Sequence, residues 1–238
     1  MTTAVPRVLA HRGATAVAPG NTLEAFVAAS ALGADGVELD VHRTADGGLV
    51  VHHDASAPGL GVLAERTRAE IRAARPEIPT LDEALEACAG MLVNIEVKNL
   101  PGDADYDPDE AVAAGVVELL TRRGLRDDVL VSSFNLESVD RVRELDTSLP
   151  TGFLVLVGMD PVDGVDLAHS HGHGAAHPDV RALARGAAAA TISRAHDLGM
   201  TVNVWTVNDE EEMRRLAAAG ADALITDVPD VARRVLGA

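Results

Sequence analysis

Hydrophobic and polar positions alternate strictly over residues 36–41, so that aliphatic residues flank Glu38 and Asp40. This two-residue period is typical of a β-strand and places the two acids on one face of it. A turn with two glycines follows, and the next apolar run, residues 49–51, leads to His53. The pattern therefore predicts two carboxylates and a histidine on neighbouring strands.

Short apolar runs alternate with helical, alanine-rich patterns along the whole chain. The predicted strands cover residues 7–10, 36–41, 91–98, 129–131, 152–157, 165–168, 201–206 and 223–226. Strands that alternate with helices favour a parallel sheet, and eight such units in 238 residues fit a TIM-type (β/α)8 barrel. We expect a single α/β domain over residues 1–238, because no linker divides the chain.

Two connections depart from this regular pattern. Residues 55–79 carry proline and glycine and only a weak helical period, and we expect them to form a loop over the barrel mouth. A loop rich in histidine and glycine, residues 169–177, follows the sixth predicted strand and precedes a helical region at about residues 178–198. We expect this histidine loop to lie near the mouth too.

The composition narrows the function classes. A net charge of −17 argues against nucleic acid and anionic membranes as partners, because binding to either needs basic patches. No segment has the roughly 18 apolar residues of a membrane span, and the chain begins without a leader pattern. We expect a cytoplasmic protein that acts on a small molecule.

Chemically active residues fall where the predicted strands end, which is where (β/α)8 barrels carry their active sites. Glu38, Asp40 and Glu96 offer the oxygen ligands that Mg²⁺ or Ca²⁺ prefers. His11 and His53 are suited to acid and base roles, and Arg12 and Lys98 are suited to bind an anionic oxygen. Together these residues favour metal-assisted cleavage of a phosphate ester.

At these positions the sequence resembles the glycerophosphodiester phosphodiesterase family. The motifs that carry the resemblance occur in order at residues 11–13, 21–26, 38–41, 44–47, 53–54, 79–81, 94–98, 133–134, 204–208 and 226–230. A single short motif has little specificity for a family, but ten such motifs in the same order along the chain are specific. The resemblance implies a TIM-type barrel that hydrolyses glycerophosphodiesters to glycerol 3-phosphate and an alcohol.

The resemblance also implies individual roles. His11 and His53 would be the acid–base pair, and the three acids Glu38, Asp40 and Glu96 would hold the divalent metal. In the implied mechanism the glycerol 2-hydroxyl attacks phosphorus, and water then opens a cyclic phosphate. The chain departs from the family at Gly20, where a metal-binding glutamate is usual.

Alternative interpretations remain at several positions. Lys98 either serves the phosphate or metal site or only forms a structural ion pair, and Trp205 belongs either to the core or to a substrate-binding wall at the mouth. His42 is expected at the surface. The histidines of residues 169–177 form a zinc site, a substrate-side element or a plain surface loop.

Three other functions fit individual features of the sequence to different degrees. A phosphodiesterase for another substrate, such as a lysophospholipid or a phosphosugar diester, would fit the short segment after His53. A barrel that only binds a phosphorylated ligand would fit Gly20. A metal-dependent amidohydrolase is disfavoured, because the first strand ends in His11-Arg12-Gly13 and lacks a His-x-His motif.

Overall fold

A closed ring of eight parallel strands forms the centre of the protein. The computed structural model describes residues 5–183 and 186–237. The strands of the ring are β1 (Arg7–His11), β2 (Gly36–Arg43), β6 (Leu92–Val97), β7 (Val129–Ser133), β8 (Thr151–Leu154), β9 (Ala175–His177), β10 (Thr201–Val204) and β11 (Ala223–Thr226). Because β1 pairs with both β2 and β11, the sheet closes on itself and the predicted (β/α)8 barrel is confirmed.

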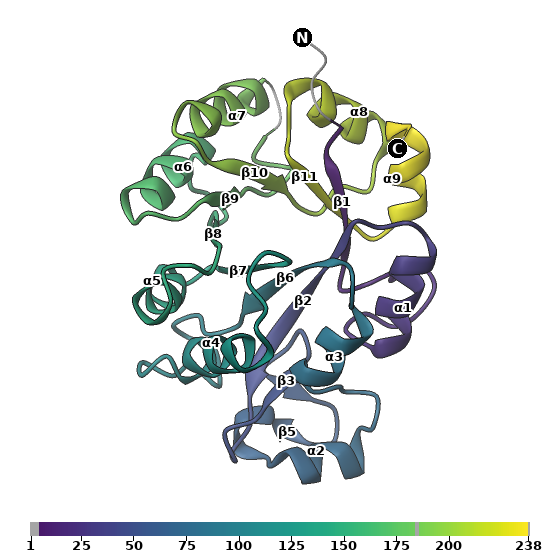
Figure 1. The fold of residues 1–238 in the computed structure, drawn as a ribbon, viewed down its shortest axis with the longest axis vertical. Coiled ribbons are helices and arrows are strands. Elements are labelled where there is room, and N and C mark those ends of the chain that lie inside the picture. The colour runs from purple at the N-terminus through teal and green to yellow at the C-terminus, as the bar shows by residue number, and fades with distance from the viewer. Residues whose placement is uncertain (1–4, 184–185, 238) are drawn as a thin grey trace.

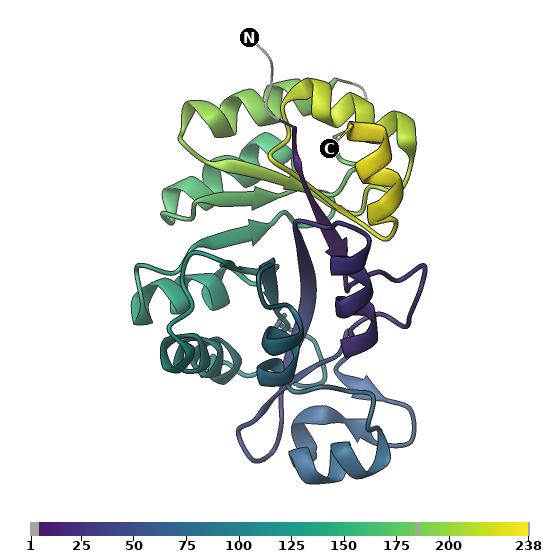
Figure 2. The same cartoon turned by 45° about the vertical axis from the view of Figure 1, so that its right-hand side comes forward.

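Helices follow the strands and surround the ring, as Figures 1 and 2 show. They are α1 (Leu23–Ala31), α3 (Leu81–Ala87), α4 (Ala111–Arg123), α5 (Leu136–Leu145), α6 (Pro161–Ser170), α7 (Ala187–Asp197), α8 (Glu210–Ala219) and α9 (Pro229–Leu236). Outward strand residues such as Leu39 and Ile95 are fully buried in the layer of aliphatic side chains beneath the helices. Because side chains alternate along a strand, their neighbours Glu38, Asp40 and Glu96 point into the ring.

The segment between β2 and α3 forms a small unit beside the barrel. It contains β3 (Leu49–Val51), which pairs antiparallel with the end of β2, the hairpin of β4 (Ser56–Ala57) and β5 (Gly61–Val62), a 3₁₀ turn (Leu63–Glu65) and α2 (Arg68–Ala74). Its apolar side chains, such as Leu63 and Ile71, bury one another in a separate core. The segment lies at the lower end of the molecule in Figure 1.

The expectation that residues 55–79 cover the barrel mouth is therefore wrong. Among the described residues, none from this segment lines the pocket that contains His11 and His53. The segment folds to the side because its own apolar residues pack against β3 and against one another.

The sixth strand lies further along the chain than the sequence predicted. Residues 165–168 belong to α6, which begins where Asp160 accepts a hydrogen bond from the Val162 backbone nitrogen at 2.8 Å. β9 is only three residues long and has no β-branched residue, so pairing with β8 and β10 determines its conformation more than its own propensity does.

The histidines of residues 169–177 do not form a loop at the mouth. His171 and His173 lie just before β9, at the opposite end of the strands, and contact the carboxylate of Asp140 at 2.8 and 3.2 Å. His177 lies within β9, and its Nε2 is 3.1 Å from Nδ2 of Asn203 inside the barrel. His171 and His173 are therefore remote from the carboxyl-terminal ends of the strands, whereas His177 is the last residue of β9 and pairs in register with Leu154 of β8.

The burial of His177 predicts a loss of stability in acid. Burial lowers the pKa of this imidazole to about 3, whereas a histidine in the unfolded chain titrates near 6.5. Between these values the unfolded chain binds more protons, so the free energy of unfolding falls as the pH drops below about 6.5. We expect H177N to reduce the difference between urea unfolding free energies at pH 7.5 and pH 5. An unchanged difference, equal to that of the exposed-site variant H196N, would contradict this assignment.

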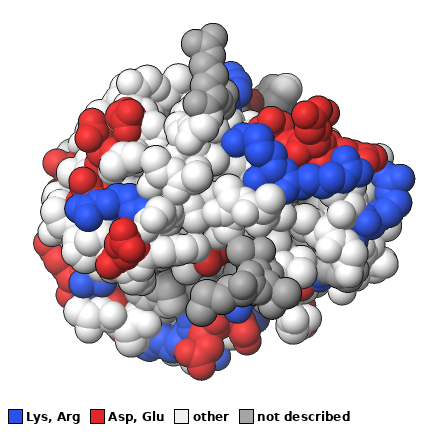
Figure 3. Space-filling model, turned by 90° about the horizontal axis from the view of Figure 1, so that it is seen from above, with Lys and Arg blue, Asp and Glu red and all other residues white. Residues whose placement is uncertain are grey.

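Charged side chains are mixed on the surface. On the face seen in Figure 3, Lys and Arg side chains lie against Asp and Glu. On α8 and α9, for example, Arg214 and Arg234 both contact the carboxylate of Glu210, at 2.7 and 2.9 Å. Within the described ranges, no helix is long and apolar enough to cross a membrane.

Candidate active site

A pocket at the carboxyl-terminal ends of the barrel strands collects most of the residues that the sequence singled out. Seven of the eight line it, namely His11, Arg12, Glu38, His53, Glu96, Lys98 and Trp205. The eighth, Asp40, is buried next to this pocket and contacts Arg12 and Lys98. The structure therefore brings all eight residues together, and we call this place the candidate pocket.

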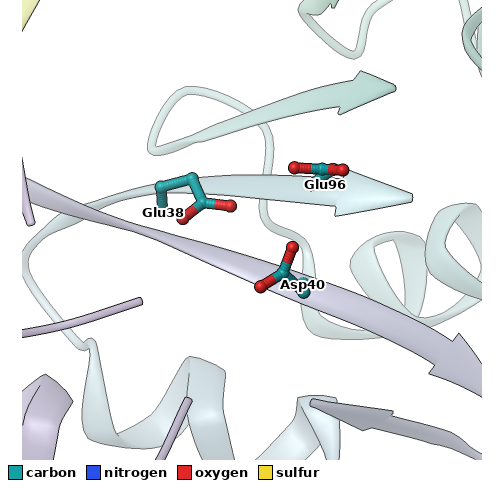
Figure 4. A group of neighbouring side chains, drawn as sticks. All are labelled: Glu38, Asp40 and Glu96. Atoms are coloured by element: carbon teal, nitrogen blue, oxygen red, sulfur yellow. The ribbon is translucent and has the colours of Figure 1, made fainter. Parts of the chain in front are cut away.

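Three buried carboxylates form the centre of the site. Asp40 on β2 and Glu96 on β6 are register partners, and Glu38 lies two residues before Asp40 on the same strand. The three side chains point toward one another (Figure 4), and one oxygen of each lies within 4.8 Å of the others. The described residues contain no other group of three acidic, histidine or cysteine side chains with ligand atoms this close.

Two cations lie against these acids. Nζ of Lys98 is 2.9 Å from Glu96 and 3.5 Å from Asp40, and Nε of Arg12 is 3.1 Å from Asp40. Burial alone would raise the pKa of the Asp40 carboxyl, but Lys98 and Arg12 outweigh it and hold that pKa below its ordinary value. Asp40 is therefore the acid of the group that stays ionised most readily.

The other two acids are poorly compensated. Burial and the neighbouring charge of Asp40 raise the pKa of Glu38 to about 8, and the same two causes raise the pKa of Glu96. Two of the three carboxyls thus keep raised pKa values although Lys98 and Arg12 lie against the group. A hard divalent cation fits this donor set, because it would take oxygen ligands and offset the remaining repulsion.

A hydrogen-bonded carboxylate orients His11. Nδ1 of His11 lies 2.8 Å from Oδ1 of Asp227. The same oxygen accepts a hydrogen bond from the Thr15 hydroxyl, and Oδ2 of Asp227 accepts one from the side-chain amide of Asn208. The opposite nitrogen, Nε2, is 3.9 Å from Glu38. Burial opposes the charged imidazole, but Asp227 and Glu38 together raise the pKa of His11 above its usual value.

His53 has a different environment. Its side chain is 44% exposed, and its Nδ1 lies 2.7 Å from Oδ1 of Asp54. Burial, together with the positive charges of Arg12 and Lys98, lowers the pKa of His53 despite the nearby Asp40. The pKa values of the two histidines are therefore shifted in opposite directions.

Trp205 forms part of the pocket wall. Its indole Nε1 donates a hydrogen bond to the His177 carbonyl at 2.8 Å, and its ring meets Phe134 edge to face at 5.5 Å between centroids. Both aromatic residues line the candidate pocket. Of the two interpretations of Trp205, the structure thus favours a position at the mouth over one in the core.

Three residues contribute to the site in ways that the sequence did not predict. Asp227 holds His11, Asn21 donates to Oδ2 of Asp40 at 2.7 Å, and His42 is buried where an exposed position was expected. Asn21 has a left-handed backbone with φ of 60°, a conformation that asparagine tolerates better than most residues. The helix that follows is capped by the next residue, Thr22.

Gly20 has limited room for a side chain. A Cβ at this position would lie 3.1 Å from both Cβ of Arg12 and Cγ2 of Thr15, so these neighbours would have to shift by a few tenths of an ångström. The loop around Gly20 is therefore packed too tightly to take a glutamate without adjustment. Asn21 and Arg12 both contact Oδ2 of Asp40.

The fold and the site define a (β/α)8-barrel hydrolase whose acidic and histidine side chains converge at the carboxyl-terminal mouth. The model of the glycerophosphoryl diester phosphodiesterase family matches residues 11–231. The chain therefore belongs to this family of enzymes.

Relatives support this membership in sequence and in structure. The chain is 32% identical to a glycerophosphodiester phosphodiesterase of Caldanaerobacter subterraneus, over 94% of both chains. The crystal structure of the glycerophosphodiester phosphodiesterase of Thermotoga maritima superimposes with a TM-score of 0.82 at 29% identity, covering 97% of this chain and 98% of that one. A phosphodiesterase of Oleispira antarctica, solved in complex with the product sn-glycerol-3-phosphate, gives a TM-score of 0.83 at 26% identity over 98% of both chains.

Proposed function

We propose that this enzyme hydrolyses glycerophosphodiesters to glycerol 3-phosphate and an alcohol, with a divalent metal and with His11 and His53 as its acid–base pair. One observation carries the proposal. Both histidines line the same pocket as Glu38 and Glu96, and each is hydrogen-bonded through Nδ1 to an aspartate. The product complex of the Oleispira antarctica relative supports the choice of product.

The proposed first step is an intramolecular attack. The substrate 2-hydroxyl oxygen bonds to phosphorus while His53, whose pKa is lowered, accepts the hydroxyl proton. The bond from phosphorus to the alcohol oxygen breaks, and His11, whose pKa is raised, donates a proton to that oxygen. An intramolecular nucleophile avoids the entropy loss of bringing two reactants together.

The second step reverses these roles. The now neutral His11 accepts a proton from the water whose oxygen bonds to phosphorus. The bond between phosphorus and the 2-oxygen breaks, and His53 returns its proton to that oxygen. Arg12 and Lys98 line the pocket as binding groups for the phosphate oxygens, and Trp205 forms a wall for the substrate. A Mg²⁺ or Ca²⁺ ion held by Glu38, Asp40 and Glu96 would neutralise negative charge on the phosphate.

The test is release of glycerol 3-phosphate from glycerophosphocholine and glycerophosphoethanolamine. The protein is stripped of metal and assayed, and then assayed again with Mg²⁺ or Ca²⁺ restored. Metal-dependent release from either substrate supports the proposal. If no metal supports release from these substrates, the proposal is wrong, and lysophospholipids and phosphosugar diesters become the next substrates to assay.

Gly20 motivates the second candidate, a barrel that binds a phosphorylated ligand without turning it over. We expect G20E to tighten Mg²⁺ binding by about tenfold, because carboxylate count tunes the affinity of oxygen-ligand sites. Isothermal titration calorimetry measures this change, and G20A controls for crowding against Arg12 and Thr15. Activity that appears only in G20E would favour the binding-only candidate, whereas equal metal affinity in G20E and G20A would contradict the expected ligand role.

Two further expectations accompany this function. We infer that residues 1–238 act as a single domain, which limited proteolysis would test through the absence of stable half-barrel fragments. The cytoplasmic location also stays a prediction, and cell fractionation checks it.

A further inference from the structure

Another histidine–aspartate pair lies against the backbone of His53, outside the roles assigned above. His42, on β2, and Asp105, in the connection between β6 and α4, are 1% and 4% exposed. Nδ1 of His42 lies 2.6 Å from Oδ2 of Asp105, and its Nε2 lies 3.2 Å from the backbone carbonyl oxygen of His53. The pair therefore touches the backbone of a proposed catalytic residue.

The imidazole of His42 is held from two sides. Both of its ring nitrogens face oxygen acceptors, a carboxylate on one side and a carbonyl on the other. A buried ring with both nitrogens bonded has one orientation, since rotation would leave buried polar groups without partners. Asp105 thus fixes the ring of His42, and that ring fixes the carbonyl of His53.

The connection that carries Asp105 is itself anchored. The side chain of Asn99 donates to the Asp107 carbonyl at 2.8 Å and accepts from the Asp107 backbone nitrogen at 2.7 Å. The Asn99 carbonyl accepts in turn from the buried side chain of Asn135. This anchoring gives Asp105 a fixed position next to the strand end that carries Lys98.

His53 needs such support because few contacts restrain its side chain. The ring is 44% exposed, and its one side-chain hydrogen-bond partner among the described residues, Asp54, is 70% exposed. An exposed pair of this kind restrains a side chain weakly. The position of the His53 ring in the pocket therefore depends on its backbone.

We propose that His42 and Asp105 are positioning residues that hold His53 at the distance the acid–base step requires. This inference rests on the proposed function, because it assumes that His53 takes part in the acid–base step. The pair acts through the backbone and touches no reacting atom.

The variant H42F keeps a ring of similar volume and removes both ring nitrogens. We expect its kcat to fall by about 10²-fold, which is what a displacement of about 1 Å of a reacting group costs. KM and the Mg²⁺ dissociation constant should stay within about threefold of wild type. The matched control is H173F, since His173 is also buried and paired with an aspartate but lies at the opposite end of the barrel.

Two conservative variants complete the series. H42Q should recover most of the loss, because its amide nitrogen can donate to the His53 carbonyl. D105N keeps the shape of the acid and should lower kcat in the same direction, and it decides the matter if H42F does not fold. A kcat that is unchanged in H42F and D105N overturns the proposal, as does an equal loss in H173F or a proportional rise in KM or in the metal dissociation constant.

A readout without turnover separates this proposal from the proposed function. The ring Cε1–H resonance of His53, assigned by its absence in H53Q, should broaden or split in H42F and stay sharp in H173F. If wild type releases no glycerol 3-phosphate but this resonance responds as expected, the positioning role stands and the proposed function fails. If wild type is active and neither the resonance nor kcat responds, the positioning role fails alone.

Discussion

Replacing His11 or His53 with glutamine is expected to lower kcat for glycerophosphodiester hydrolysis by roughly 10²- to 10⁴-fold, the usual contribution of one general acid or base. Both rings line the pocket, and neither belongs to the apolar core, so we expect the variants to fold like wild type. Release of glycerol 3-phosphate at saturating substrate measures kcat, and thermal unfolding checks the fold.

Two comparisons make this prediction specific. H171Q also removes a histidine paired with an aspartate, but at the opposite end of the barrel, and should leave kcat unchanged. D227N should fall between H11Q and wild type, because it removes the carboxylate that orients the ring and favours its charged form. If H11Q or H53Q keeps wild-type kcat, that histidine has no part in the mechanism.

The acidic centre of the site was predictable because its signal is local. Along β2 the acids Glu38 and Asp40 alternate with aliphatic residues, and an alternating strand can turn only one face into a barrel. Glu96 follows from the same argument on β6, which is the register neighbour of β2. The closed barrel followed from the alternation of strands and helices along the chain.

The parts that could not be predicted depend on tertiary contacts. β9 has three residues and little strand propensity of its own, and its neighbours on both sides hold it in the sheet. The apolar residues of the segment 55–79 gave no sign that they would pack on one another beside β3 instead of over the mouth. Pairing between distant segments decides such cases, and a single sequence carries little information about it.

The residues that orient the two histidines show the same limit. Asp227 and His11 are 216 positions apart, and His42 and Asp105 are 63 apart. Their side-chain types are common at strand ends, so only the closed ring reveals which ones meet. The proposed catalytic groups were recognisable from sequence, whereas the residues that hold them in place required the structure.

Removal of one carboxylate from the acidic centre should separate activity from stability. We expect E38Q to lose at least about 10²-fold in kcat, because a bound metal contributes several kcal/mol of transition-state stabilisation and 1.36 kcal/mol corresponds to tenfold. In the metal-free protein the same change should raise the free energy of unfolding, since it relieves repulsion between Glu38 and Asp40. Urea unfolding in the presence of a chelator measures this gain.

The raised pKa of Glu38 also predicts how the free energy of unfolding of the metal-free protein changes with pH. The pKa of Glu38 is about 8 in the folded state and near its ordinary value of 4.5 when unfolded, so the folded state binds the additional proton between these values. The free energy of unfolding should therefore fall as pH rises from about 4.5 to about 8, and E38Q should flatten that decline. E110Q is the matched control, because Glu110 is a buried acid with a raised pKa that is bonded to Ser138 outside the pocket. If E38Q retains metal-dependent activity, or if E110Q loses as much activity as E38Q, Glu38 is not a ligand of the metal that the reaction needs.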